Sequence, residues 1–163
     1  MNDANRTDWQ GYEGLLDKEW GRARRERCEL GLLIVDVDQQ DKLAEAFGPQ
    51  VIDKVASRVN AVIVRLLRRA ADSVMSVGRA KFAVVMPNTP IAGAMDVAES
   101  VRKAVVAADF SPDVPGGHPV TVSVGAAAAV PLPGVVSMSL GHGAIAALEQ
   151  ARRQGGNRVV KLQ

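Results

Sequence analysis

The chain has 163 residues, of which 47% are hydrophobic, 23% charged and 4% aromatic, and 20 basic against 18 acidic residues give a formal net charge of +2. This composition is typical of a globular domain with an aliphatic core rather than of a disordered or membrane chain. Because no apolar run reaches the roughly 18 residues of a membrane span, we expect no membrane partner and a cytoplasmic location. We expect neither a disulfide from the single Cys28 nor a structural zinc from His118 and His142.

The first half of the chain predicts a helix, a buried strand and two further helices. Apolar residues at helical spacing from Tyr12 to Ala23 indicate a leading amphipathic helix after an N-terminal tail of residues 1–11. The run ELGLLIVDVD is continuously apolar and ends in two aspartates, which is typical of a strand buried on both faces. Gly48 and Pro49 then interrupt a helical pattern, so we expect a short helix followed by a long one.

The second half predicts a hairpin, two helices and two further strands. SVMSVG and KFAVVMP are so close that a tight turn through Gly78, Arg79 and Ala80 must join them as antiparallel strands. Thr89 and Pro90 suit the cap and first turn of the next helix. The segment VTVSVGAAAAV then predicts a strand, the stripe around Ala144 to Ala151 a helix, and RVVKL a last strand, with PDVPGGHP and PLPGVVSMS as loops.

Taken together, these elements predict a single α+β domain. After the leading N-terminal helix, their order is β-α-α-β-β-α-β-α-β, and this order contains the ferredoxin-like pattern of strand, helix, two strands, helix and strand. We therefore expect a central, mainly antiparallel sheet covered by helices. Because this fold hosts many unrelated functions, it does not decide the function by itself.

Four segments, in this order and spacing, resemble the GGDEF domain of diguanylate cyclases: LGLLIVDVD, SVGRAKFAVVMPNT, VTVSVGAA and ARRQGGNRVV. The resemblance implies a nucleotidyl-cyclase-like fold and one GGDEF-type domain over residues 12–163. It also implies the family's activity, in which a homodimer condenses two GTP into cyclic di-GMP with two divalent metals. Many such domains carry an inhibitory product-binding site on the flank.

The signature turn departs from the family pattern. Where active members have Gly-Gly-Asp/Glu-Glu-Phe, this chain has Gly78, Arg79, Ala80, Lys81 and Phe82. Phosphoryl transfer of this kind needs metals, and Mg²⁺ requires oxygen ligands. Lys81 instead places a cation where the family has an anion, and a unit-charge pair at about 4 Å is worth about 4 kcal/mol at a dielectric near 20. We therefore expect a degenerate domain with no catalytic residue, no metal and no required cofactor.

Other positions keep part of the family's substrate site. Asp36 matches the first metal-binding aspartate, with Asp38 on the same strand face, while Asp53 matches a guanine-reading position and Arg152 replaces a phosphate-binding lysine. Three further positions of the family site are changed, namely Asp41, Ala44 and Gly156. The four retained residues are thus a vestigial substrate site. Alternatively, the two aspartates end the strand and cap the next helix, and the other two residues are solvated.

A second motif matches the family's inhibitory site, Arg-x-x-Asp, at Arg69 and Asp72, and its offset from Gly78 agrees with the family's placement. A guanidinium binds a guanine edge or a phosphate, and a carboxylate accepts the guanine N1 and N2 protons, so such a site needs no metal. Further candidates for this site are Arg65, Arg68 and Arg102, the last because the family's third arginine falls on Ser100. The alternative is a simple helix-end ion pair worth a few tenths of a kcal/mol.

These observations favour a catalytically inactive domain that binds cyclic di-GMP and signals to a protein partner, with a homodimer as a possible assembly. The alternatives are an interaction module that binds no nucleotide, and residual GTP binding or cyclase activity. The basic segment RARRER, residues 22–27, is interrupted by Glu26 and lacks interleaved aromatic residues. It therefore indicates a solvated helix face, and we do not expect nucleic acid binding.

Overall fold

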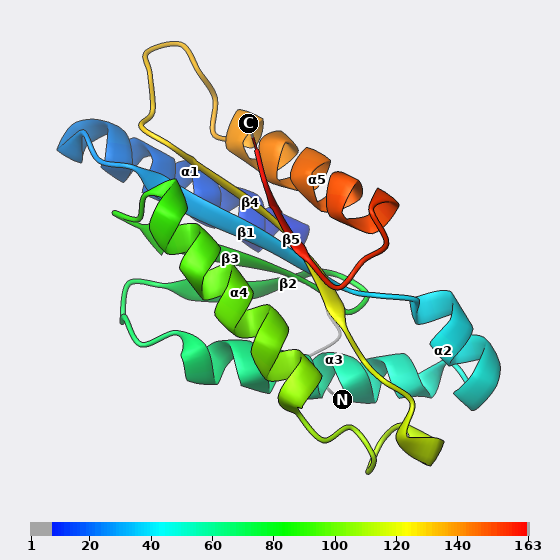
Figure 1. Ribbon diagram of the computed structural model, residues 1–163. Helices are drawn as coiled ribbons and strands as arrows, with labels where there is room; N and C mark the ends of the chain where they lie inside the picture. The colour runs from blue at the N-terminus through cyan, green and yellow to red at the C-terminus, as the bar shows by residue number, and fades with distance from the viewer. Residues whose placement is uncertain (1–7, 163) are drawn as a thin grey trace.

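A computed structural model describes residues 8–162, and these form a five-stranded sheet with helices on both faces (Figure 1). The elements in chain order are α1 (Trp9–Glu26), β1 (Leu30–Val37), α2 (Gln40–Phe47), α3 (Gln50–Leu66), β2 (Ser73–Gly78), β3 (Lys81–Pro87), α4 (Ile91–Ala107), β4 (Val122–Ala129), α5 (Met138–Arg153) and β5 (Val159–Lys161). The strand order is β2-β3-β1-β4-β5, with only β5 parallel to its neighbour. The predicted α+β fold is confirmed.

Strand β1 lies at the centre of the sheet and is buried on both faces. Its residues Leu33 and Val35 join a core cluster with α3 and α4, whereas Leu32 and Ile34 join a second cluster with α1 and α5. Successive side chains of a strand point to opposite faces, so a strand covered by helices on both sides needs an uninterrupted apolar run. This explains why the segment LGLLIV lacks alternation.

Helix α1 begins at Trp9, three residues earlier than the apolar pattern suggested. The carboxylate of Asp8 accepts a hydrogen bond of 2.7 Å from the backbone N–H of Gly11, and such a cap stabilises the first turn. Residues 9–11 of the predicted tail are therefore helical, and residues 1–7 of that tail lie outside the described residues. No helix in the part of the chain that the structure describes has the length and apolar character required to cross a bilayer.

The predicted hairpin is present, with only Arg79 and Ala80 between its strands. Gly78 pairs with Lys81, and Ala80 has a positive φ of 49°. Ala80 is buried, and its carbonyl accepts a 3.1 Å hydrogen bond from the backbone N–H of Val37. The turn is thus fastened to the end of β1.

Two local predictions need correction. Thr89 does not cap α4, because Pro90 occupies the N-cap position in an extended conformation and the helix starts at Ile91. The Thr89 hydroxyl instead donates to the Pro87 carbonyl at 3.1 Å and accepts a hydrogen bond from Arg69. The predicted loop PDVPGGHP contains a short 3-10 turn, Pro115–Gly117.

Helix α5 approaches the sheet very closely at Gly125 of β4. A Cβ atom there would lie 2.0 Å from the carbonyl oxygen of Ala144 and 2.4 Å from the nitrogen of Leu148, both backbone atoms of α5. We expect Gly125→Ala to lower the free energy of unfolding by about 3 kcal/mol or more, because neither backbone atom can move without displacing the helix. Urea denaturation measures the change.

Gly14→Ala is the matched control. Gly14 lies inside α1, and a methyl group added to its Cα would have nothing within 4 Å, so alanine should stabilise the chain by about 0.5–1 kcal/mol. Equal effects of the two substitutions would contradict the tight packing of α5 on β4.

Candidate functional site

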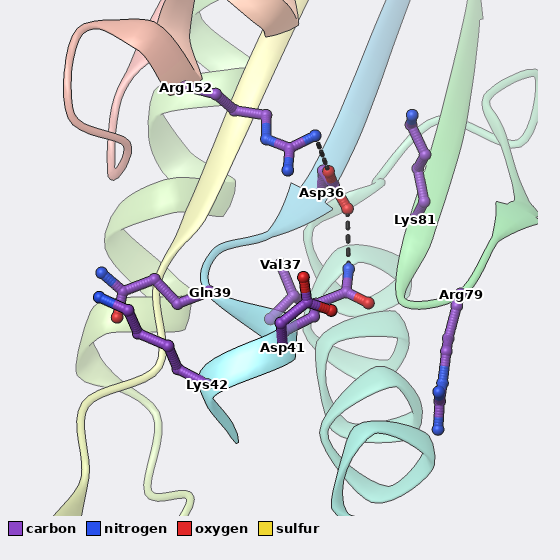
Figure 2. Close-up of a pocket in the computed structure, with 9 residues that line it drawn as sticks. Asp36, Val37, Gln39, Asp41, Lys42, Arg79, Lys81 and Arg152 are labelled. Carbon is purple, nitrogen blue, oxygen red and sulfur yellow. Dashed lines mark hydrogen bonds and ion pairs between the residues drawn. The ribbon is translucent and has the colours of Figure 1, made fainter. Parts of the chain in front are cut away.

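A cavity of about 440 Å³ lies where the end of β1, the first turn of α2, the hairpin turn and the end of α5 meet (Figure 2). Its lining residues are Asp36, Val37, Gln39, Gln40, Asp41, Lys42, Arg79, Lys81 and Arg152. Four of these side chains are cationic and two are carboxylates, so the lining carries an excess of positive charge.

Asp36 lies between Arg152 and Lys81 in this cavity (Figure 2). Its Oδ2 is 3.3 Å from Nη1 of Arg152, and its Oδ1 accepts a 2.9 Å hydrogen bond from Nε2 of Gln40. Lys81 is directly opposite on β3, because the register pairs the two residues. The structure therefore brings Asp36 and Arg152 together in one cavity.

Burial dominates the electrostatics of Asp36, whose residue is 6% exposed. Loss of water around the carboxylate raises the pKa of Asp36 to about 6, although Lys81 and Arg152 act in the opposite direction. Two cations beside the carboxylate thus compensate only part of its desolvation.

Asp38 has a structural role at the end of the sheet. Its carboxylate accepts hydrogen bonds from the hydroxyls of Thr121 and Ser123 at 2.7 and 2.6 Å, and from the backbone N–H of Asn157 at 2.9 Å. Neither aspartate caps α2, because the N-cap of that helix is Gln39, which makes no side-chain capping bond within residues 8–162. Asp38 therefore ties β4 and the segment before β5 to the end of β1.

Asp53 is not among the residues that line this cavity. It is half-buried in the first turn of α3. Asp53, predicted to contact the base, and Asp36, predicted to bind metal, therefore do not line the same cavity. Asp36 and Arg152 share this cavity, and Asp38 and Arg152 together line a neighbouring cavity of about 400 Å³.

The hairpin turn contributes two cations and no acid to the cavity. Arg79 donates a 2.7 Å hydrogen bond through Nη2 to the carbonyl of Pro49, which holds the turn against the start of α3. Phe82 is buried in the core cluster beneath α3 and α4. Among residues 8–162, no group of three or more His, Cys, Asp or Glu side chains is arranged to hold a metal ion.

Arg69 and Asp72 are close together before β2. Nε of Arg69 is 3.9 Å from Oδ1 of Asp72, and the two side chains are 48% and 6% exposed. Arg69 also donates to the Thr89 hydroxyl at 2.7 Å and to the Pro87 carbonyl. Burial raises the pKa of Asp72 against the opposing effect of Arg69, and its Oδ1 has no hydrogen-bond partner within the described residues.

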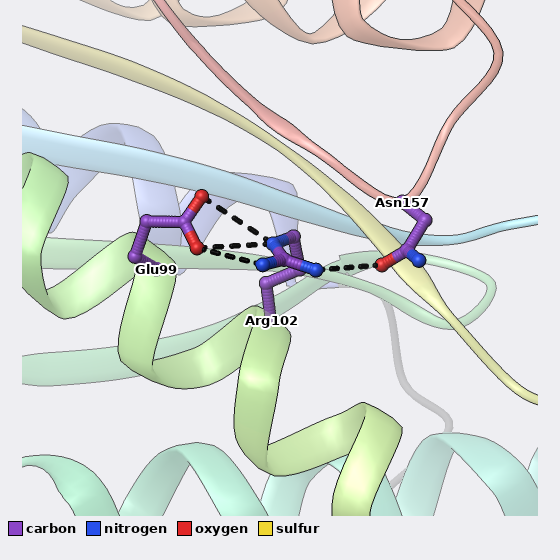
Figure 3. Close-up of polar contacts among 3 residues, drawn as sticks. All are labelled: Glu99, Arg102 and Asn157. Atoms are coloured by element: carbon purple, nitrogen blue, oxygen red, sulfur yellow. Dashed lines mark hydrogen bonds and ion pairs between the residues drawn. The ribbon is translucent and has the colours of Figure 1, made fainter.

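The other candidate arginines lie in different places. Arg65 and Arg68 lie at and after the end of α3, and Arg65 lines a separate cavity of about 460 Å³. Arg102 binds Glu99, with its shortest contact at 2.9 Å, and donates to Oδ1 of Asn157 at 3.1 Å (Figure 3). Asn157 precedes β5, whereas Arg69 precedes β2, and these strands are the two edges of the sheet.

Four strand spacings of about 4.8 Å separate β2 from β5, or about 19 Å in all. The structure therefore does not join Arg102 to the Arg69 and Asp72 pair. Sequence reasoning also missed two partners, Gln40 for Asp36 and Thr89 for Arg69. No sequence pattern indicated that Gln40 would bind Asp36. The polar segment NTP before α4 did indicate that the Thr89 side chain could form a hydrogen bond.

The architecture and the hairpin beside the end of β1 are those of a nucleotidyl-cyclase-like domain. A family model described as "Diguanylate cyclase, GGDEF domain" matches residues 5–158. The chain belongs to the GGDEF family, as its sequence segments indicated.

Two curated relatives illustrate the similarity. The response regulator PleD of Caulobacter vibrioides is 32% identical over 118 residues, which are 71% of this chain and 25% of that protein. The diguanylate cyclase DgcP of Pseudomonas aeruginosa is 28% identical over 95 residues, 58% of this chain and 14% of that protein. The chain thus spans about a quarter or less of the length of these relatives.

Solved structures of the family are similar over nearly the whole chain. The active GGEEF domain of a diguanylate cyclase from Vibrio cholerae has a TM-score of 0.85 at 20% identity, covering 98% of this chain and 97% of that one. The GGDEF domain of DgcB from Caulobacter crescentus, in complex with c-di-GMP, has a TM-score of 0.84 at 25% identity, covering 94% and 87%.

The pKa of Asp36 gives a prediction on stability. The folded chain holds the Asp36 proton up to about pH 6, whereas the ordinary value is 3.8, so the folded state binds more protons between these values. This contribution to stability is present at low pH and is lost as the pH rises toward 6. Asparagine keeps this position uncharged at every pH. The gain in the free energy of unfolding of Asp36→Asn over the unsubstituted chain should therefore be about 1–3 kcal/mol larger at pH 7 than at pH 4.

Urea denaturation of the variant and of the unsubstituted chain at both pH values measures the difference. Asp41→Asn removes an exposed carboxylate of the same cavity and is the control of equal charge. If Asp36→Asn and the unsubstituted chain lose stability in parallel over this range, the buried Asp36 carboxylate is not the cause.

Proposed function

We propose that this GGDEF domain does not make cyclic di-GMP, that it binds cyclic di-GMP through Arg69 and Asp72, and that it passes the bound state to a protein partner. The GGDEF domain of DgcB, which was solved with c-di-GMP, supports the choice of ligand. The position of Lys81 opposite Asp36 is the observation that supports the proposed inactivity. The proposed boundary of the domain is residue 12, with a tail before it.

The residues present do not fit two divalent metal ions. Asp36 is the one buried carboxylate that the cavity offers among residues 8–162, and it is already bound by Arg152 and Gln40. Lys81 stands opposite it, and an ammonium there repels a metal as strongly as a carboxylate would attract it. Hard divalent cations need several oxygen ligands, which this lining does not supply.

The Arg69 and Asp72 pair has properties that suit a guanine nucleotide. The guanidinium is half-exposed and is held by Pro87 and Thr89, so little side-chain entropy is lost on binding. Oδ1 of Asp72 is buried and lacks a hydrogen-bond donor within the described residues, and its 3.9 Å separation from Arg69 is longer than a good charge-assisted bond. Contact with a guanine therefore requires the Asp72 side chain to turn toward the surface. The N1 and N2 protons of guanine are donors of the kind that this carboxylate needs.

A protein partner is the proposed route for the signal. The diguanylate cyclase SiaD of Pseudomonas aeruginosa, 25% identical with a TM-score of 0.84, was solved with its activator SiaC. Two cyclic di-GMP molecules shared between two such surfaces would also link copies of the domain into a dimer. Sedimentation with and without cyclic di-GMP distinguishes these two modes. A mass that doubles with ligand indicates the linked dimer, and an unchanged mass indicates a monomer that acts through a protein partner.

Calorimetric titration with cyclic di-GMP tests the site. We expect Arg69→Ala to weaken binding by about tenfold or more, because it removes the charged donor. Arg25→Ala makes the same change of charge on an exposed position of α1 and should bind like the unsubstituted chain. Thr89→Val removes a hydrogen-bond partner of Arg69 but keeps the guanidinium. If this variant still binds cyclic di-GMP, the loss of binding in Arg69→Ala comes from the lost ligand contact and not from a local loss of structure.

Full binding by Arg69→Ala would remove the site assignment. Flat titrations of the unsubstituted chain with both cyclic di-GMP and GTP would instead favour the nucleotide-independent interaction module.

Metal binding tests the proposed inactivity. With GTP and Mg²⁺ or Mn²⁺ we expect the unsubstituted chain to make no cyclic di-GMP. Lys81→Glu should bind Mn²⁺ about tenfold more tightly or better, because it places a second carboxylate opposite Asp36. Chromatography of the products and Mn²⁺ paramagnetic resonance provide the two measurements. Lys18→Glu, on the exposed side of α1, is the control of equal charge. Product that disappears in Asp36→Ala would restore the cyclase alternative.

A further inference from the structure

The loop between β4 and α5, residues 130–137, carries an exposed apolar surface. Leu132 and Val136 are 62% and 66% exposed, and Val130 and Val135 are exposed as well. These four are half of the eight large apolar side chains that are exposed in the part of the chain that the structure describes. Scattered apolar side chains are normal on a protein surface, whereas several gathered in one place mark an interaction surface.

This loop has a defined shape and is fastened to α1. The backbone N–H of Val135 donates to the Leu132 carbonyl at 3.2 Å, and the Trp20 indole N–H donates to the Val135 carbonyl at 3.1 Å. The Ser137 hydroxyl donates to the Asp17 carboxylate. Figure 1 shows the loop extending beyond the ends of β4 and α5. The loop is therefore a protrusion and not the wall of a groove.

Arginines of α1 lie beside this protrusion. Asp17, Trp20 and Arg24 have the spacing i, i+3 and i+7, so they share one face of the helix. The first two of these residues contact the loop, and Arg24 is the next residue along the same face. Arg24 is exposed. Its guanidinium is therefore available to a partner that meets the loop.

The sheet register brings the end of α1 to the same place. Leu30 pairs with Ala129, so the residues just before β1 lie beside the residues just after β4. Arg27, which is exposed and follows the last residue of α1, is therefore also near the loop. The loop has no charge of its own, because the chain has no Asp, Glu, Lys or Arg between Asp113 and Glu149.

The end of α1 has an excess of positive charge. Residues 22–29 contain four arginines and two glutamates, and Glu26 is bound by Arg22 at 3.0 Å. A second copy of the same surface would bring like charges together, which is unfavourable. An anionic lipid surface instead suits both features, since its headgroups attract the arginines and its acyl boundary accepts the apolar side chains.

We propose that this end of the domain docks on an anionic lipid membrane, where Leu132 and Val136 enter the headgroup region and Arg24 and Arg27 contact the lipid phosphates. The expectation of no membrane partner rested on the missing membrane span, and a surface contact needs none. The inference goes beyond the proposed function and does not depend on the binding of cyclic di-GMP.

Cosedimentation with lipid vesicles tests the proposal. We expect the unsubstituted chain to bind vesicles of phosphatidylcholine and phosphatidylserine about tenfold more tightly, or better, than vesicles of phosphatidylcholine alone, and added salt to weaken this binding. Leu132→Ser combined with Val136→Ser should weaken it by about tenfold or more, because the apolar contact is lost. Arg24→Gln combined with Arg27→Gln should weaken it by about tenfold or more as well, because the charge is lost.

Val106→Ser and Lys54→Gln are the matched controls and should bind like the unsubstituted chain. Val106 is 53% exposed near the end of α4, and Lys54 is exposed in the first half of α3. Both lie toward the opposite end of the sheet, where β4 begins and where Arg79 of the hairpin turn binds Pro49. The eight residues of β4 separate the two ends by about 25 Å. Thermal melting establishes that each variant is folded.

Three results would overturn the lipid partner. The first is no binding to the anionic vesicles. The second is unchanged binding by the double serine variant, because charge alone would then explain the association. The third is a doubled mass in sedimentation without lipid or nucleotide that the double serine variant loses, because the protrusion would then contact a second copy of the chain.

Discussion

One buried carboxylate, Asp36, with Arg152 in contact and Lys81 opposite, sets the electrostatics of the cavity. Asp36 ends the central strand, where the sheet register places it opposite Lys81 and the end of α5 brings Arg152 to 3.3 Å. A carboxylate taken out of water is costly unless it is paired, and an unpaired one is protonated instead. In this GGDEF domain the direct partners of the carboxylate are the guanidinium of Arg152 and the side-chain amide of Gln40.

The positions of the two cations follow from the core. Val35 and Ile34 anchor β1 between two helical layers, and a slip of one residue would turn both to the wrong face. The register that buries them also sets Asp36 beside Lys81. The same antiparallel pairing holds the turn, through the bond from Val37 to the carbonyl of Ala80. Packing therefore fixes the electrostatics, and a change of charge in the hairpin alters the cavity without altering the fold.

Much of the architecture could be predicted because each element carries its own signal. The hairpin followed from two strand-like runs with almost no residues between them, and the pair of helices after β1 followed from Gly48 and Pro49. The start of α4 was placed one residue too early, because the capping preference of Thr89 was weighed without its competing bonds to Pro87 and Arg69. The contact of Arg102 with Asn157 spans 55 residues, and no local pattern encodes it. The ion pair of Asp36 with Arg152 was not predicted, because the family resemblance placed both residues in the substrate site without joining them.

Arg69 belongs to the scaffold as well as to a surface. Its bonds to the Pro87 carbonyl and the Thr89 hydroxyl clasp the connection between β3 and α4. These bonds, worth about 1.5–3 kcal/mol each, hold the half-exposed guanidinium in one position. The surface that Arg69 presents therefore shares the rigidity of β3 and of the start of α4, and a substitution of Arg69 alters the packing there as well as the surface charge.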